Sequence, residues 1–343
     1  MTDHRRVLGQ TGVATTVMGI GCATLFHLSR PSDRRRIIDV AFSHGLTHFD
    51  VAPMYGLGLA ERELGSFLQG RREQVTVATK FGIDPTLLGR TAGRLQRPMR
   101  AALRRLPRAG RGLKSSGRGV ASGAVGQLLY TSEPYTPDVV RRSLDRSLSR
   151  LQTDYVDIFL IHDPTEELLA SRTELVDYLT SEVTNGRIRT WGSAADINSP
   201  VGEVKALSQS SPVLQFRDDI FEQSPRASIA PDRAAVTFGI MERALPSLIA
   251  YFDQSETERV AWSNRLAFDV AVPGALAHLL LRQALHRNQT GPVLFSSTRP
   301  DRVREAATMT GAPRDGATME VEASVLSDLA RAVLRAERRT DAP

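Results

Sequence analysis

Short apolar runs alternate along the chain with longer segments in which apolar residues recur every three or four positions. The runs at residues 75–79 (VTVAT) and 156–161 (VDIFLI) are rich in β-branched or large apolar side chains, as in strands that are covered on both faces. Residues 60–68 and 137–151 instead gather their apolar side chains on one side of a helix. The repeated pattern predicts a series of β/α units.

This alternation extends over the whole chain. Strands are predicted at residues 16–20, 47–49, 75–79, 156–161, 189–192, 213–216, 235–238 and 293–295. Helices are predicted at residues 32–43, with Ser32 as the N-cap, and at 60–68, 137–151, 166–184, 200–207, 273–286, 300–308 and 321–337. Because only a short segment separates the sixth strand from the seventh, the helix between them is predicted to be short or missing.

Eight strands that alternate with helices predict an α/β fold, a single (β/α)8 TIM barrel over residues 1–343. The alternative is a doubly wound sheet, which usually carries a G-x-G-x-x-G turn after its first strand. Here the first strand leads into GIGCAT (residues 19–24), which lacks the third glycine and has no helix directly behind it. The barrel is therefore favoured.

The composition is that of an ordinary globular protein. The 343 residues are 41% hydrophobic and 24% charged. A chain of this length and hydrophobic content can bury a large core. The single cysteine, Cys22, excludes an internal disulfide and fits a reducing cytoplasm. The N-terminal residues MTDHRRVLGQ lack the apolar stretch of a secretory signal, and no run approaches about 18 apolar residues. We therefore expect a cytoplasmic protein without a membrane segment.

The net charge of +6 is concentrated in residues 85–132, a basic insertion after the third strand that contains ten basic residues and no acidic one. Within it Leu95, Met99, Leu103 and Leu106 recur at helical spacing. The insertion is either a lid that guides acidic or phosphorylated substrates or screens a bulky one, or a solvated loop rich in Gly and Ser. Nucleic acid and membranes are not expected partners, because no aromatic residues stand between the arginines. The polar segment 239–271 is likewise either a latch over a cofactor or a surface excursion.

Four chemically active side chains follow neighbouring predicted strands. Asp50 and Tyr55 follow the second strand, Lys80 ends the third, and His162 follows the fourth. Each alone has an ordinary explanation, such as an ion-pair partner, a turn cap or a packing residue. Because the carboxyl ends of barrel strands meet at one rim, the four together favour a catalytic site.

These side chains suit the chemistry of carbonyl reduction, which needs a proton donor beside the carbonyl oxygen. Tyrosine has a reference pKa of about 10, and a neighbouring ammonium favours the phenolate and lowers that pKa. The chain has only three lysines, so Lys80 stands out among its many arginines. Asp50 is expected to pair with Lys80, and His162 to donate to the carbonyl oxygen. General acid catalysis of this kind is worth about 10²–10⁴-fold.

The motifs around these residues resemble the aldo/keto reductase family. FDVAPMYGLGLAERELG (residues 49–65) is similar to the family signature D-x-A-x-x-Y-G, while Lys80 lies in VTVATKFG and His162 in DIFLIHDP. The resemblance covers about residues 6–310 and is closest to the aldose-dehydrogenase-like branch, which includes sugar and pyridoxal oxidoreductases. It implies a barrel with an N-terminal β-hairpin, no metal or flavin, and NADP(H), or sometimes NAD, acting on a small carbonyl or alcohol.

The resemblance also implies where the cofactor binds. The family holds the adenosine 2′-phosphate after the eighth strand, here FSSTRPDRVREAA (residues 295–307), where Arg302 falls at the position of the phosphate-binding arginine and backbone N–H groups follow Pro300. A serine N-cap region with solvated arginines is the alternative. The expected cofactor contacts are Gly21, Ser193, Gln215, Ser296, Ser297, Arg299 and Arg302.

Two positions depart from the family pattern. Where the family stacks an aromatic ring on the nicotinamide, this chain reads RDD (residues 217–219), and Phe216 or Phe221 is the candidate substitute. The fifth-strand motif Gly-Val-Ser-Asn is replaced by WGSAAD (residues 191–196), in which a one-residue shift recovers Ser193. These departures leave open a second hypothesis, a non-catalytic cofactor-binding regulatory subunit, although the four retained residues favour an enzyme.

Overall fold

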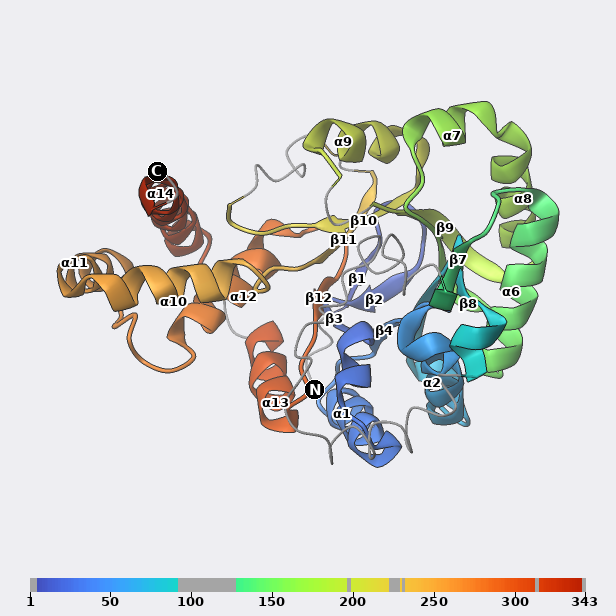
Figure 1. Ribbon diagram of the computed structural model, residues 1–343, viewed down its shortest axis with the longest axis horizontal. Helices are drawn as coiled ribbons and strands as arrows, with labels where there is room; N and C mark the ends of the chain where they lie inside the picture. Colours follow the sequence, from blue (N-terminus) through green and yellow to red (C-terminus); the bar gives the residue numbers. More distant parts are fainter. Residues whose placement is uncertain are drawn as a thin grey trace.

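The computed structural model describes residues 5–91, 128–195, 199–221, 229, 232–311 and 315–340. Its centre is a closed barrel of eight parallel strands in the order β3-β4-β5-β8-β9-β10-β11-β12, with β12 paired to β3 (Figure 1). These strands are β3 (Met18–Gly21), β4 (His48–Asp50), β5 (Thr76–Phe81), β8 (Val156–His162), β9 (Ile188–Ala194), β10 (Val213–Arg217), β11 (Ala234–Phe238) and β12 (Val293–Phe295). The predicted (β/α)8 barrel is confirmed.

The strands are joined by helices that surround the barrel (Figure 1). The outer helices are α1 (Pro31–Ser43), α2 (Ala60–Leu68), α6 (Pro137–Leu151), α7 (Glu166–Ser171), α8 (Thr173–Thr184), α9 (Val201–Ser210) and α13 (Pro300–Thr308). Short 3-10 helices lie at η1 (Ala23–His27), η2 (Tyr55–Gly58), η3 (Arg72–Gln74) and η5 (Met309–Gly311). The described residues between β10 and β11 contain no helix, as the short spacing predicts.

Two details of the predicted helices were wrong. The single helix expected at residues 166–184 is divided between α7 and α8 at Arg172, whose φ of −123° and ψ of 60° are not helical. Ser32 is not the N-cap of α1, because that position belongs to Arg30 and Pro31 already occupies the first turn. Proline fits the first turn because its missing N–H would have no intrahelical partner there.

The predicted N-terminal hairpin is present, and a second antiparallel pair lies at the base of the basic insertion. The hairpin joins β1 (Arg5–Val7) to β2 (Ala14–Thr16), and the second pair joins β6 (Ile83–Pro85) to β7 (Tyr130–Ser132). The β6–β7 pair holds the two ends of the insertion together directly after β5. The rest of the insertion, residues 92–127, lies outside the described residues, and so does the predicted amphipathic helix.

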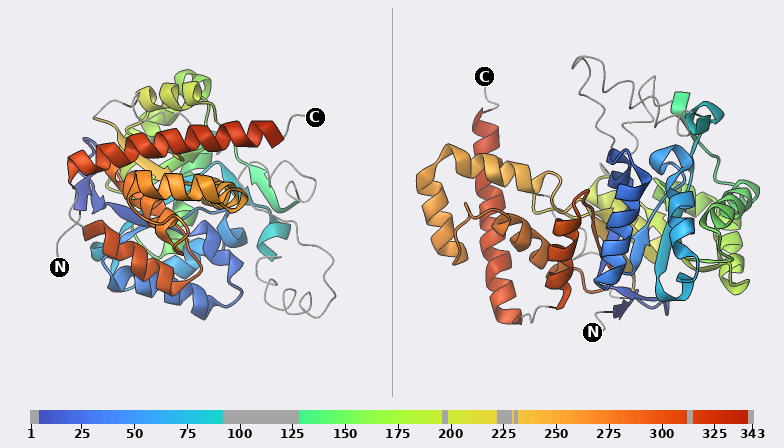
Figure 2. Two further views of the ribbon diagram at one scale, coloured as in Figure 1. Left: turned by 90° about the vertical axis from the view of Figure 1, so that its left-hand side faces the viewer. Right: turned by 90° about the horizontal axis from the view of Figure 1, so that it is seen from below.

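A helical arm extends from the barrel on the side of β11 and β12 (Figure 1). It consists of α10 (Ala244–Gln254), α11 (Glu256–Leu266), α12 (Ala275–Arg287) and α14 (Gly316–Thr340), and α14 lies across the other three helices (Figure 2). Leu248, Trp262, Leu279 and Leu329 belong to a hydrophobic core of its own. The polar segment 239–271 thus includes two packed helices. No helix in the described ranges is long and apolar enough to cross a bilayer.

Strand alternation decides which side chains enter the barrel. On β8, Ile158 and Leu160 belong to the interior cluster, whereas Phe159 and Ile161 pack in the cluster between strands and helices. Because successive side chains point to opposite faces of a strand, His162 continues the inward series at the carboxyl end. Lys80 follows Ala78 on β5 in the same way, so both reach the barrel mouth.

A buried polar layer lies deeper in the barrel, below Asp50. His48 is fully buried, and its Nδ1 lies 3.1 Å from Thr15 Oγ1 and 3.0 Å from Thr76 Oγ1. A Cβ on Gly19 would come within 2.4 Å of the His48 ring, so the ring needs glycine beside it. Burial lowers the pKa of His48 from 6.5 to about 4, so the imidazole is neutral in the folded protein at neutral pH.

We expect His48 to make the protein acid-sensitive. The unfolded chain binds a proton at His48 below about pH 6.5, whereas the folded protein resists it down to about pH 4, so stability falls with pH inside this window. Between about pH 7.5 and pH 5 this residue alone contributes a loss of about 2 kcal/mol. Urea denaturation of wild type and His48→Asn measures the effect, with His44→Asn as an exposed control. Equal losses in all three proteins would contradict the assignment.

Candidate active site

The structure brings the four predicted catalytic residues together at the barrel mouth. Asp50 ends β4, Lys80 lies near the end of β5, His162 ends β8, and Tyr55 begins η2 directly after β4. Asp50, Lys80 and His162 are 3%, 2% and 8% exposed, so water has little access to their polar groups. Electrostatic interactions among such buried groups are much stronger than at the surface.

Lys80 connects the carboxylate to the phenol. Its Nζ donates to Asp50 Oδ1 at 2.6 Å and to Oδ2 at 2.9 Å, and it lies 3.4 Å from Tyr55 Oη. Burial opposes the charged form of Lys80, but Asp50 and Tyr55 more than offset it, and the pKa of Lys80 is raised. Lys80 is therefore an ammonium that is held by Asp50 and reaches the tyrosine oxygen.

The net effect on Tyr55 differs from the simple expectation of an acidified phenol. Desolvation raises the pKa of Tyr55, and this outweighs the lowering caused by the charge of Lys80. The expected direction of the Lys80 contribution holds, but the tyrosine as a whole is less acidic than in water. It is therefore a protonated donor at neutral pH, and Lys80 limits the rise of its pKa.

The turn that presents Tyr55 depends on glycine. Gly56 has a φ of 61°, and a Cβ at this position would come within 2.3 Å of the Phe26 ring. Leu57 also has a positive φ of 57°. Left-handed backbone at consecutive positions is unfavourable for residues other than glycine, so packing of the surrounding residues must fix the turn. This turn directs the Tyr55 ring toward Lys80, whose Nζ lies 5.1 Å from the ring centroid.

His162 is neutral, and a tyrosine of the neighbouring loop binds its backbone carbonyl. Burial, together with the charge of Lys80, lowers the pKa of His162 to about 3. The Tyr135 hydroxyl donates to the His162 carbonyl at 2.6 Å, and Asp163, the next residue, has a positive φ of 51°. A neutral imidazole has one N–H to donate, so it can bind a carbonyl oxygen without adding charge.

Gln215, from the opposite side of the barrel, contacts the same carboxylate. Its Nε2 donates to Asp50 Oδ2 at 2.7 Å, and both residues are 3% exposed. Gly21 pairs with Asp50 in register and lies below Ser296, whose Oγ donates to the Gly21 carbonyl at 3.0 Å. A Cβ on Gly21 would come within 2.6 Å of Ser296 Oγ, so glycine makes room for that serine.

Strand alternation keeps Ser193 away from the mouth. Ser193 pairs in register with Leu214, which packs against the outer helices, and its Oγ lies 2.7 Å from Ser211 Oγ just after α9. Ser193 is fully buried there. The shift that was expected to recover this serine as a cofactor contact therefore places its side chain on the outer face of β9.

The two proposed aromatic substitutes also lie away from the mouth. Phe216 is fully buried in the outer cluster, and Phe221 packs against the core of the helical arm. Arg217 forms an ion pair with Asp219 at 3.2 Å. Phe238, which sequence reasoning missed, is partly buried against the interior cluster and is the register partner of Arg217 at the end of β11. Its place in the inward series after Val236 was the available signal.

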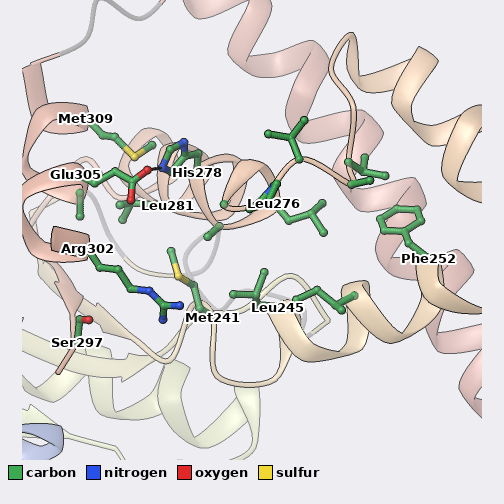
Figure 3. A pocket seen from close by; sticks show the side chains of 18 of the residues that line it. Met241, Leu245, Phe252, Leu276, His278, Leu281, Ser297, Arg302, Glu305 and Met309 are labelled. Atoms are coloured by element: carbon green, nitrogen blue, oxygen red, sulfur yellow. Dashed lines mark ion pairs between the residues drawn. The ribbon is translucent and has the colours of Figure 1, made fainter. Parts of the chain in front are cut away.

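A cleft of about 540 Å³ lies between the helical arm and the end of β12 (Figure 3). Ser296, Ser297 and Arg302 line it, and Arg302 makes no ion pair with another residue of the described ranges. Arg299 does not line the cleft and is paired with Asp301 in solvent. Of the four residues expected around the adenosine phosphate, the structure gathers three in one cleft.

One contact across the cleft was not expected from the sequence. His278 of α12 and Glu305 of α13 form an ion pair at 2.7 Å across it (Figure 3). Glu305 lies one helical turn after Arg302, which was the available signal. Apolar residues of the helical arm and its connections complete the lining, among them Met241, Leu245, Phe252 and Leu276. The segment expected as a latch or an excursion therefore forms a packed wall of the cleft.

Known proteins share this sequence pattern and fold. A model of the aldo/keto reductase family matches residues 17–215. A D-threo-aldose 1-dehydrogenase from a Pseudomonas species is 25% identical over 97% of this chain and 99% of its own length. A pyridoxal 4-dehydrogenase from Microbacterium luteolum is 32% identical over 50% of this chain and 46% of its own length.

Two solved structures show the same fold at low identity. An aldo-keto reductase from Bacillus halodurans, in its holo form, superposes with a TM-score of 0.67 at 19% identity and covers 94% of this chain and 95% of its own. An aldo/keto reductase from Klebsiella pneumoniae in complex with NADP and acetate has a TM-score of 0.59 at 18% identity, with coverage of 94% and 95%. The agreement extends over nearly the whole chain.

Proposed function

Since the chain belongs to the aldo/keto reductase family of oxidoreductases, we propose that it transfers a hydride between NADP(H) and a small aldehyde, ketone or sugar. Tyr55 is the proposed general acid and base. The observation that carries the proposal is the position of Tyr55 Oη, 3.4 Å from a Lys80 ammonium that a buried Asp50 holds at 2.6 Å. A tyrosine in ordinary packing does not need such a pair.

In the proposed reduction, Tyr55 gives its proton to the substrate oxygen as negative charge develops there. Lys80 stabilises the phenolate that remains, and Asp50 keeps Lys80 charged and directed toward Tyr55. His162 donates its N–H to the same substrate oxygen and so orients it. The nicotinamide, when bound, supplies or accepts the hydride. In the reverse direction the Tyr55 phenolate takes the proton of the alcohol.

The cleft beside β12 fits the adenosine end of NADP. Arg302 offers a guanidinium that has no ion pair with any residue the structure describes, and Ser297 offers a hydroxyl, while the N-terminus of α13 adds backbone N–H groups that favour a phosphate. Ser296 contacts Gly21 of β3, and Gly21 pairs with Asp50 of β4, so the cleft adjoins the four proposed catalytic residues. We leave Ser193 and Arg299 out of the proposed cofactor site, because neither lines the cleft or the barrel mouth.

Phe238 and Gln215 are the proposed nicotinamide contacts. Both lie on the inward faces of adjacent strands, and an aromatic ring at the mouth supplies the stacking surface that residues 217–219 lack. Gln215 can exchange hydrogen bonds with the carboxamide through its amide oxygen and its second N–H.

Arg302→Ala is expected to weaken NADP binding by about tenfold or more, because a charge-assisted hydrogen bond to phosphate contributes about 1.5–3 kcal/mol. The affinity for NAD, which lacks the 2′-phosphate, should change little. Fluorescence titration with each cofactor measures both. Arg299→Ala is the matched control and should change NADP affinity less than about threefold. Equal losses for NADP and NAD in Arg302→Ala would show that Arg302 does not read the phosphate.

The activity itself is tested with a panel of aldehydes, ketones and sugars, assayed in both directions with the preferred cofactor. We expect turnover of at least one class of substrate, and substitution of Tyr55 should remove nearly all of it. Cofactor binding without turnover over the whole panel would instead favour a non-catalytic cofactor-binding subunit. In that case the departures at residues 191–196 and 217–219 would be the first changes to revert.

A further inference from the structure

The side-chain amide of Gln215 is bonded directly to the catalytic carboxylate. Its nitrogen lies 2.7 Å from Asp50 Oδ2, and a carboxylate can only accept hydrogen bonds, so the amide nitrogen and not the oxygen must face Asp50. The same Oδ2 also accepts from Lys80 at 2.9 Å, while Oδ1 accepts from Lys80 at 2.6 Å. The Asp50 carboxylate therefore accepts hydrogen bonds both from Lys80 of β5, which contacts Tyr55, and from Gln215 of β10, which lies in the proposed cofactor site.

These contacts form a continuous path from β10 to the phenol. Gln215 donates to Asp50, Asp50 pairs with Lys80, and Lys80 reaches Tyr55 at 3.4 Å. The Gln215 side chain makes no other hydrogen bond within the described part of the chain. Its carbonyl oxygen and second N–H thus remain available at the mouth.

We propose that Gln215 is a positioning residue that sets the acidity of Tyr55 through Asp50 and Lys80, and thereby links the nicotinamide subsite to proton transfer. The inference rests on the proposed function, in which Gln215 also meets the carboxamide. A molecule bound in the nicotinamide subsite can strengthen or weaken the hydrogen bond that Gln215 donates to Asp50. Such a change reaches the carboxylate over this one hydrogen bond.

The direction of the effect follows from charge. The N–H of Gln215 offsets part of the negative charge of Asp50 in a site with little water, where a hydrogen bond to an ion is strong. Without it, Asp50 neutralises more of the Lys80 charge and repels a phenolate more strongly. The phenolate of Tyr55 is then less stable, so the pKa of Tyr55 rises.

Gln215→Met removes the donor and nearly keeps the volume. In the oxidation direction, which needs the phenolate, the rising limb of kcat against pH should move upward by about half a unit or more, equal to about a threefold lower rate on the limb. Gln283→Met, at another buried glutamine that contacts Met319 and Glu322 in the helical arm, is the control and should leave the limb unchanged.

Gln215→Glu tests the same contact with opposite chemistry. It places a second carboxyl group beside Asp50, and two carboxylates so close cannot both ionise freely. At low pH, where the two carboxyl groups share a proton, residue 215 still donates a hydrogen bond to Asp50. The rising limb of kcat against pH should then lie closer to wild type than in Gln215→Met. At higher pH the added charge should move the Tyr55 titration further upward than in Gln215→Met. Thermal melting of both variants checks that they are folded.

A measurement on the cofactor-free protein separates this inference from the proposed function. The tyrosinate difference spectrum of each protein against its Tyr55→Phe counterpart follows Tyr55 alone and needs no turnover. An upward shift in Gln215→Met supports the coupling even if no substrate is found. An unchanged Tyr55 titration in a folded Gln215→Met, with only cofactor affinity reduced, would overturn it and leave Gln215 as a cofactor contact.

Discussion

Tyr55→Phe is expected to lower kcat by about 10²–10⁴-fold while cofactor affinity stays within about twofold of wild type. The substitution removes one oxygen, which is the atom that Lys80 approaches at 3.4 Å, and keeps the ring that packs at the barrel mouth. The substrate oxygen then loses the group that transfers a proton to it, and only the orienting N–H of His162 remains. Steady-state kinetics and fluorescence titration of the cofactor measure the two quantities on the same preparation.

A matched tyrosine in the helical arm provides the control for this prediction. The Tyr251 hydroxyl donates to Glu258 at 2.8 Å, and Tyr251→Phe removes the same atom far from the mouth. Its kcat should equal that of wild type. A Tyr55→Phe protein that retains more than about a tenth of wild-type turnover would mean that another group transfers the proton, and the proposed role of Tyr55 would fail.

Lys80→Met is expected to cost about 3–5 kcal/mol of unfolding free energy in addition to activity. Lys80 and Asp50 are 2% and 3% exposed, so loss of the ammonium leaves a buried carboxylate whose one remaining strong partner among the described residues is the Gln215 amide. Such an uncompensated charge is far more destabilising than loss of the pair as a whole. Urea denaturation at neutral pH measures the change.

The double variant Asp50→Asn/Lys80→Met identifies the cause of that loss. With the charge of Asp50 also removed, most of the stability should return, while turnover should remain as low as in the single variant. If the double variant is as unstable as Lys80→Met alone, the loss comes from packing of the lysine stem and not from an isolated carboxylate.

Two residues suggested as nicotinamide contacts lie away from the mouth for the same reason. Ser193 was reached by a one-residue shift of the fifth-strand motif, and Phe216 was a candidate because it adjoins the missing aromatic position, but both lie on the outward faces of their strands. A shift of one residue moves a strand side chain to the opposite face of the sheet. A residue one position away from a family motif therefore does not occupy the same place in space. Phe238 was overlooked although it satisfies the alternation.

The sequence by itself determined the barrel and which four side chains gather at its mouth. Each β/α unit is visible locally, because strand and helix periods differ, and the carboxyl ends of parallel strands must share one rim. Asp50, Tyr55, Lys80 and His162 could therefore be assigned to one rim from the sequence alone. The predicted helices 60–68, 137–151 and 300–308 end where the structure ends them.

Only the tertiary structure decided how charge is distributed within that site. The bond from Gln215 to Asp50 joins residues 165 positions apart, and the balance at Tyr55 between desolvation and Lys80 depends on burial that no local pattern encodes. The same holds for the helical arm, whose polar-looking segment packs because α12 and α14 cover it. The periodicity of the sequence determines which face of a helix or strand is apolar. Which other element covers that face is determined only when the whole chain packs.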